Sequence, residues 1–132
     1  MRRQVNTRRF KRVDQALLSE VTRRIVALSH PEKIVMFGSR GRGTPGEHSD
    51  LDLLVVAPSD EPRHRRSVPL YLALSDILLP MDILVYTADE VQEWENVPQA
   101  FVTTALREGR VLYEKPEKMF ETRAEAKRGY EG

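Results

Sequence analysis

Apolar residues recur every three or four positions near the start of the chain, between Asp14 and Leu28. This interval places side chains on one face of a helix. Asp14 can cap the first turn, and the His30-Pro31 pair ends the pattern because the residue before a proline is disfavoured in helical conformation. The spacing predicts an amphipathic helix whose apolar positions are Leu17, Leu18, Val21, Ile25 and Leu28.

Three short apolar runs follow, at residues 34–37, 51–57 and 81–86. Each ends at a glycine, proline or threonine and is too short for a typical helix, so each predicts a buried strand. Helical spacing over residues 68–78 separates the second and third runs, and such a unit favours parallel strands with a right-handed crossover. The expected fold class is α/β (α+β), a small mixed β-sheet flanked by helices.

The end of the chain shows weaker patterns. Residues 87–90 have the form of a capping box that opens a helix, and a second helical stretch at about 99–108 ends at Gly109. Residues 111–113 are expected to be extended. We therefore divide the chain into a basic arm at 1–12, one domain at 13–114 and a charged tail at 115–132.

Composition narrows the class of protein. The chain has 132 residues, 40% hydrophobic and 31% charged, which fits one globular domain. No apolar run approaches the roughly 20 residues that a membrane helix needs, and no secretory signal follows the basic start, so we expect a cytoplasmic protein. Cysteine is absent, which excludes disulfides and thiolate metal sites.

The first twelve residues hold six arginines or lysines and no acid. Such an arm can bind nucleic acid. A solvated tail, or an arm that docks on an acidic neighbour, is the plainer interpretation. Nothing else in the sequence indicates a nucleic-acid partner.

A glycine-rich connection, residues 38–49, follows the first predicted strand. Gly38 can turn the chain sharply and bring backbone N–H groups close to an anion. If Ser39 opens a helical turn, its hydroxyl and the free N–H groups there would face a phosphate. Taken alone, the segment is equally compatible with an ordinary strand-to-loop turn.

Acidic residues mark the second and third predicted strands. Asp50 and Asp52 are two positions apart, so their side chains share one face, while Leu51 and Leu53 point into the core. Asp82 lies near the start of the third apolar run, and parallel strands would place it at the same edge. Such carboxylates suit Mg²⁺ or Mn²⁺ together with substrate phosphates. Solvent-facing acids at a strand edge, with Asp82 as a turn residue, are the alternative.

Together these motifs resemble the DNA polymerase beta-like nucleotidyltransferase superfamily, and within it the minimal nucleotidyltransferases (MNT). The resemblance rests on Gly38-Ser39, Arg42-Gly43, Ser49-Asp50-Leu51-Asp52-Leu53 and Asp82. It spans residues 34–86 in motif, and the order of elements extends it to about 113. One departure is Gly41, where the family more often has alanine; the turn stays feasible.

The resemblance implies roles for these residues. Asp50 and Asp52 would ligate two Mg²⁺ ions, with Mn²⁺ as a substitute, that grip ATP or another nucleoside triphosphate. Asp82 would complete the metal and catalytic site and accept the proton of an attacking hydroxyl. Gly38 and Ser39 would hold the β- and γ-phosphates. Arg42 would neutralise phosphate charge or brace the loop against an acid.

Three functions are compatible with this pattern. The first is transfer of a nucleoside monophosphate, AMP in the first instance, to a hydroxyl on a partner protein; MNT proteins are often antitoxins paired with a helical HEPN-type toxin. The second is a binding module that restrains such a partner by contact alone. The third is modification of a small molecule such as an aminoglycoside, or of an RNA end, which would need a pocket completed by homo- or hetero-oligomerisation.

Other polar and aromatic residues have plainer interpretations. His48 is expected to be a loop residue, and the basic cluster at 63–66 a solvated helix face. Tyr71 and Tyr86 are expected to pack in the core. Trp94 and Phe101 are expected to serve packing rather than base stacking.

Overall fold

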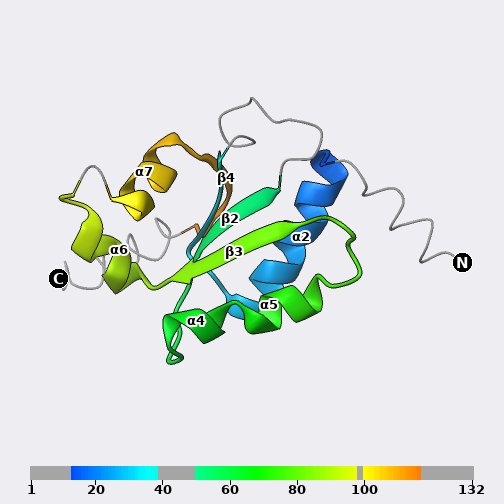
Figure 1. The fold of residues 1–132 in the computed structure, drawn as a ribbon, viewed down its shortest axis with the longest axis horizontal. Helices are drawn as coiled ribbons and strands as arrows, with labels where there is room; N and C mark the ends of the chain where they lie inside the picture. The colour runs from blue at the N-terminus through cyan, green and yellow to red at the C-terminus, as the bar shows by residue number, and fades with distance from the viewer. Residues whose placement is uncertain (1–12, 39–49, 98–99, 117–132) are drawn as a thin grey trace, which may run out of the picture.

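The computed structural model describes residues 13–38, 50–97 and 100–116 (Figure 1). Its elements, in chain order, are α2 (Gln15–Ser29), β1 (Lys33–Phe37), β2 (Leu51–Val56), α4 (Arg63–Arg66), α5 (Val68–Ala73), β3 (Met81–Tyr86), α6 (Ala88–Trp94), α7 (Phe101–Glu108) and β4 (Arg110–Glu114). The three predicted strands are confirmed to within one residue at each end, and the extended segment at 111–113 belongs to β4.

The sheet is mixed, as predicted. Its strand order is β3-β2-β1-β4, with β2 and β3 parallel. β1 pairs antiparallel with both β2 and β4. The connection from β2 to β3 runs through α4 and α5, so the expected strand-helix-strand unit is present.

Hydrophobic residues pack on both faces of this sheet. One face forms the larger cluster with α2 and α5, and alternate residues of β2, namely Leu51, Leu53 and Val55, point into it. On the other face Val35 and Leu54 pack against Val102 and Ala105 of α7. Figure 1 shows α6 and α7 gathered at one end of the molecule, apart from α2 and α5. The central strand β2 is therefore held from both sides.

Capping residues define the helix ends that the sequence predicted. The Asp14 carboxylate accepts a hydrogen bond from the Leu17 amide at 2.9 Å, and α2 stops at His30 in a left-handed conformation with φ of 49°. At α6 the Thr87 hydroxyl accepts from the Glu90 amide, and the Glu90 carboxylate accepts from the Thr87 amide. Both caps satisfy first-turn N–H groups that have no partner inside the helix.

The helix expected from the spacing over 68–78 is present but shorter. α5 covers only Val68–Ala73, a break before Pro69 separates it from the short helix α4, and hydrogen-bonded turns lead from Leu74 to β3. Pro69 explains the break, because proline has no N–H for the preceding turn and fits only the first turn of a new helix.

Tyr71 corrects a second expectation. Its side chain is 39% exposed rather than buried in the core. Its hydroxyl accepts a hydrogen bond of 2.7 Å from the Ile83 amide. Because β3 is an edge strand of the sheet, Tyr71 supplies an acceptor for a backbone donor on that edge.

No helix within residues 13–38, 50–97 and 100–116 is both long enough and apolar enough to cross a membrane.

Candidate active site

Asp52 and Asp82 are direct neighbours on adjacent strands. In the parallel pairing of β2 with β3, Asp52 lies opposite Asp82, and on the other side of β2 it lies opposite Phe37 of β1. Residues opposite each other across neighbouring strands point to the same face, and the strands are about 4.8 Å apart. The two carboxylates therefore project side by side, as predicted, from the face that also carries Leu54 and Leu84.

A backbone hydrogen bond fixes this register where the strands begin. The amide of Leu51, the first residue of β2, donates to the carbonyl of Pro80, the residue just before β3, at 3.0 Å. Leu51 itself is fully buried in the larger cluster. The position of Asp52 is thus set by its two buried neighbours, Leu51 and Leu53, which anchor the strand from the opposite face.

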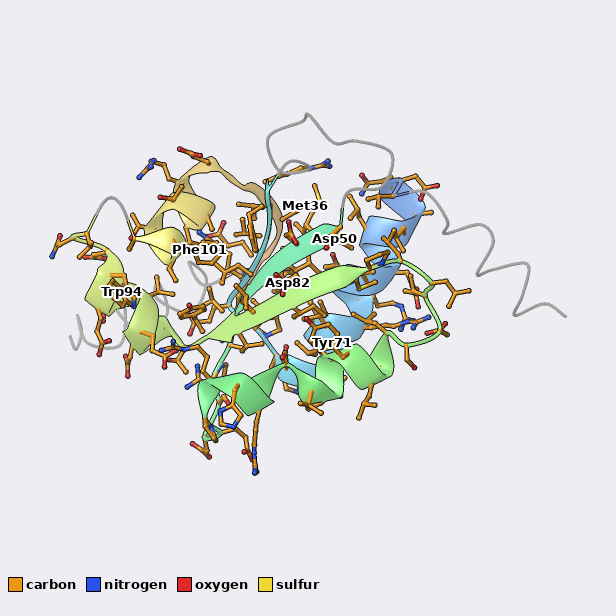
Figure 2. All side chains as sticks on the ribbon, in the orientation of Figure 1. Met36, Asp50, Tyr71, Asp82, Trp94 and Phe101 are labelled. Carbon is orange, nitrogen blue, oxygen red and sulfur yellow. The ribbon has the colours of Figure 1, made fainter. Side chains whose placement is uncertain are left out.

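Asp50 lies just before β2, two residues from Asp52, and is exposed. Figure 2 shows it at the start of β2, with Asp82 on the neighbouring strand. Among the described residues, no three His, Cys, Asp or Glu side chains come together as a group that could hold a metal ion. The structure pairs Asp52 with Asp82 and leaves Asp50 at the strand end.

Gly38 packs directly against Asp52. Its backbone has φ of 74°, in the region that side chains rarely adopt, and a Cβ at this position would overlap Oδ2 of Asp52. Gly38 therefore has the left-handed conformation that a sharp turn can use, and glycine is required there for two reasons, backbone conformation and space. Ser39 and Arg42, the other predicted phosphate-binding residues, lie outside the described residues.

The donor set fits a hard divalent cation. Asp52 is partly buried and Asp82 exposed, and both offer only carboxylate oxygens. Mg²⁺ commonly uses one or two carboxylates and completes its octahedron with water and substrate phosphates. A pair of neighbouring carboxylates beside a glycine turn therefore suits Mg²⁺ or Mn²⁺ with a phosphate ester.

The basic cluster at 63–66 is not a uniformly solvated face. Arg66 is only 9% exposed, and its guanidinium donates to the Glu90 carboxylate at 2.7 and 3.1 Å and to two backbone carbonyls. This hydrogen bonding, reinforced by the Thr87 amide, lowers the pKa of Glu90 to about 2. Arg66 therefore ties α4 to α6 and is not placed to bind phosphate.

The neighbouring basic residue Arg63 lies over the Tyr86 ring, with its guanidinium carbon 4.8 Å from the ring centroid. This contact is a cation–π interaction at the end of β3. It leaves Tyr86 partly buried rather than deep in the core.

One side of the site was not foreseen from the sequence. Phe101, expected only to pack, is 47% exposed and meets Phe37 edge-to-face, with ring centroids 5.2 Å apart. The spacing of Phe101, Thr104 and Glu108, three and four positions apart, was the signal that α7 presents one face here. This spacing alone does not show which element the face of α7 contacts, because that depends on the packing of α7 against β1.

Three of the solved structures to which the chain is similar have TM-scores below 0.5. A Sulfolobus solfataricus protein assigned as a nucleotidyltransferase is 22% identical, with a TM-score of 0.46, over 69% of this chain and 78% of its own. A toxin–antitoxin complex with AMP-PNP is 16% identical, with a TM-score of 0.46, over 86% of this chain and 93% of its own.

A variant of the MntA–HpeT toxin–antitoxin pair is 17% identical, with a TM-score of 0.48, over 90% of this chain and 94% of its own. Comparison with curated proteins gives no match.

A family match covers most of the chain. The family described as "Polymerase beta, Nucleotidyltransferase" matches residues 20–118. This span contains the Gly38 turn, the pair Asp52 and Asp82, and all four strands. The chain belongs to the polymerase beta nucleotidyltransferase family.

Proposed function

We propose that the chain transfers a nucleoside monophosphate, AMP in the first instance, from a nucleoside triphosphate to a hydroxyl group of a partner protein. The observation that carries the proposal is the side-by-side pairing of Asp52 and Asp82, with the Gly38 turn packed against Asp52. Membership of the nucleotidyltransferase family supports the reaction class.

In this proposal Asp52 and Asp82, together with Asp50, hold Mg²⁺ beside the phosphates. The ion would neutralise charge on the triphosphate and orient its oxygens. Gly38 allows the backbone to approach closely, and the predicted phosphate contacts continue through Ser39 and Arg42. Because each carboxylate repels its neighbour and the phosphates, the site needs that cation to bind substrate.

Asp82 is the exposed member of the pair, and on this proposal it is the one that the acceptor approaches. Its carboxylate would take the proton of the acceptor hydroxyl. The hydroxyl oxygen then bonds to the α-phosphorus, the bond from that phosphorus to the bridging oxygen breaks, and pyrophosphate leaves with the electron pair. Asp52 keeps its charge throughout and positions the phosphate.

The partner and the acceptor follow from the resemblance to minimal nucleotidyltransferases, which supports a helical HEPN-type toxin as the protein that is modified. On this proposal the partner supplies the hydroxyl, and the chain supplies the nucleotide site. A hetero-oligomer of the two proteins would form at least transiently.

The test is label transfer from α-³²P-ATP to a co-purified or candidate partner, with Mg²⁺ present. Asp52→Asn keeps the shape of the side chain and removes its charge, so we expect loss of transfer with an unchanged melting curve. Asp60→Asn is the matched control, an exposed aspartate in the loop after β2, and should transfer normally.

Transfer that survives in Asp52→Asn would defeat the assigned role of the pair. If wild type binds a partner tightly but labels neither it nor a small acceptor such as an aminoglycoside or an RNA end, the chain acts by contact and the transfer reaction is wrong. If only the small acceptor is labelled, the protein acceptor is wrong.

A further inference from the structure

A cavity of about 310 Å³ lies between the end of β1 and α7. Four of its wall residues come from α7 at intervals of three and four positions, so one face of that helix forms the wall. The lining residues are Phe37, Gly38, Phe101, Thr104, Ala105, Glu108 and Gly109.

The cavity and the aspartate pair share Gly38. One side of this residue lines the cavity, and its Cα adjoins the Asp52 carboxylate. Phe37, which precedes it, lies opposite Asp52 in the sheet. A ligand with one end in the cavity therefore has its other end within reach of the two carboxylates.

Two of the lining residues, Phe37 and Phe101, are aromatic and contact each other, yet Phe101 remains partly exposed. Phe101 meets Phe37 edge-to-face at an interplanar angle of 81°, which leaves much of its own ring surface exposed. Flat bases stack on exposed aromatic rings regardless of base identity, because every base has a π-face. Figure 2 shows Phe101 on the α7 side of the sheet, with Asp82 on β3.

Glu108 places a carboxylate in the wall of the cavity. Its carboxylate accepts hydrogen bonds only and repels phosphate. Its ion pair with Arg107 at 3.4 Å joins two half-exposed neighbours in sequence, and such pairs are weak enough to be exchanged for a ligand. An uncharged group with hydroxyl or amino donors suits this end of the cavity, and the phosphates suit the opposite end.

We propose that this cavity holds the nucleoside half of the nucleoside triphosphate. Phe101 provides a stacking surface for the base, and Glu108 accepts from hydroxyl or amino groups of the nucleoside. This inference rests on the proposed function, since it places the phosphates at Gly38 and the aspartates. It makes α7 the element that recognises the nucleoside, whereas β1, β2 and β3 recognise the phosphates.

The test compares ATP with inorganic triphosphate, which lacks the nucleoside, by calorimetry on the full chain with Mg²⁺. Phe101→Ala should weaken ATP binding about 10-fold and leave triphosphate binding unchanged. Phe101→Leu keeps apolar bulk without a flat ring and should show the same selectivity if alanine impairs folding. Trp94→Ala is the matched control, a similarly exposed aromatic outside the cavity, and should change neither affinity.

Glu108→Gln should weaken ATP binding selectively as well. If the ribose hydroxyls are its donors, 2′,3′-dideoxy-ATP will be insensitive to the substitution; if the base amino group is the donor, purine riboside triphosphate will be insensitive instead. Either pattern supports the cavity.

Unchanged ATP affinity in both the Phe101 and Glu108 variants would overturn the inference, as would equal losses for ATP and triphosphate. Asp52→Asn separates it from the proposed function. If that variant loses both ligands while the cavity variants lose neither, the phosphate site stands and the nucleoside site fails. If only the cavity variants lose ATP binding, the nucleoside site stands and the phosphate site fails. If wild type binds neither ligand, both fail.

Discussion

Replacing Gly38 by alanine tests the site at its tightest point. Alanine at a φ of 74° carries the left-handed penalty of roughly 1–2 kcal/mol that L-residues incur. Its methyl group would also overlap Oδ2 of Asp52, so the carboxylate must rotate or the strands must part. Steric overpacking of this kind typically costs about 1–3 kcal/mol. We expect a total loss of about 2–4 kcal/mol, because a carboxylate that is only partly buried can move aside.

Urea unfolding of the Gly38→Ala variant measures this loss, and a cycle with Asp52→Ala separates its two parts. Without the carboxylate the methyl group meets no obstacle, so only the backbone penalty should remain. Gly38→Ala should therefore cost less in the Asp52→Ala background, by about 1 kcal/mol or more. For a domain of this size the wild-type background should show a melting temperature lower by roughly 10–20 °C.

Additive effects within about 0.5 kcal/mol would show that Gly38 and Asp52 are not in contact. A fully stable Gly38→Ala variant would refute the conformation assigned to the turn as well. Gly109→Ala is an informative control. A Cβ there would crowd Val35 and two backbone carbonyls, so it should destabilise the fold without coupling to Asp52.

Three further predictions concern the scaffold and the metal. The pKa of Glu90 is lowered from 4.5 to about 2 by Arg66, so the pair stabilises the fold above about pH 4.5, and this contribution is lost as pH falls towards 2. Urea unfolding at pH 7 and pH 3 should show Glu90→Gln about 2 kcal/mol less stable than wild type at the higher pH and about 1 kcal/mol or less below it at the lower, where the Glu90 carboxyl of the folded protein is still mostly ionised; a constant difference would contradict this. Tyr71→Phe removes the acceptor for the Ile83 amide and should cost about 1 kcal/mol and speed hydrogen exchange there, whereas unchanged exchange would show that the bond is not formed in solution. Mg²⁺-ATP at 100 times its dissociation constant should add about 2.7 kcal/mol of stability in wild type and far less in Asp52→Asn, and a melt that neither Mg²⁺-ATP nor Mn²⁺-ATP shifts would count against the metal site.

The parts of the fold that local pattern determines were predictable. Strands at 34–37, 51–57 and 81–86 are apolar runs with clear ends, and burial on both faces of the sheet is what such runs require. The pairing of Asp52 with Asp82 followed from the parallel crossover, because parallel neighbours bring equivalent strand positions to one edge. Those residues could be placed without knowledge of any side-chain contact.

Features that depend on long-range contacts were not predictable. Arg66 and Tyr71 have ordinary helical surroundings in sequence, and their partners Glu90 and Ile83 lie 24 and 12 residues away. The pairing of β4 with β1 likewise joins segments far apart in the chain. Without that pairing, nothing in the sequence brings Phe101 beside Phe37, so the contact between the two rings could not be foreseen.

The larger hydrophobic cluster and the acid pair lie on opposite faces of the sheet. Leu51 and Leu53 point into the large cluster beneath α2 and α5, and Asp52 between them points to the opposite face. Successive side chains of β2 point to opposite faces, so the buried leucines hold the strand in place. Asp52 is therefore well positioned although it is not itself fully buried. On its own face the acid pair is bordered by Phe37 and by the apolar residues that pack under α7, and Asp82 is exposed. On the proposed function, this placement would let the triphosphate bind beside Gly38 and Asp52 while the acceptor approaches the exposed Asp82, as an in-line transfer between them requires.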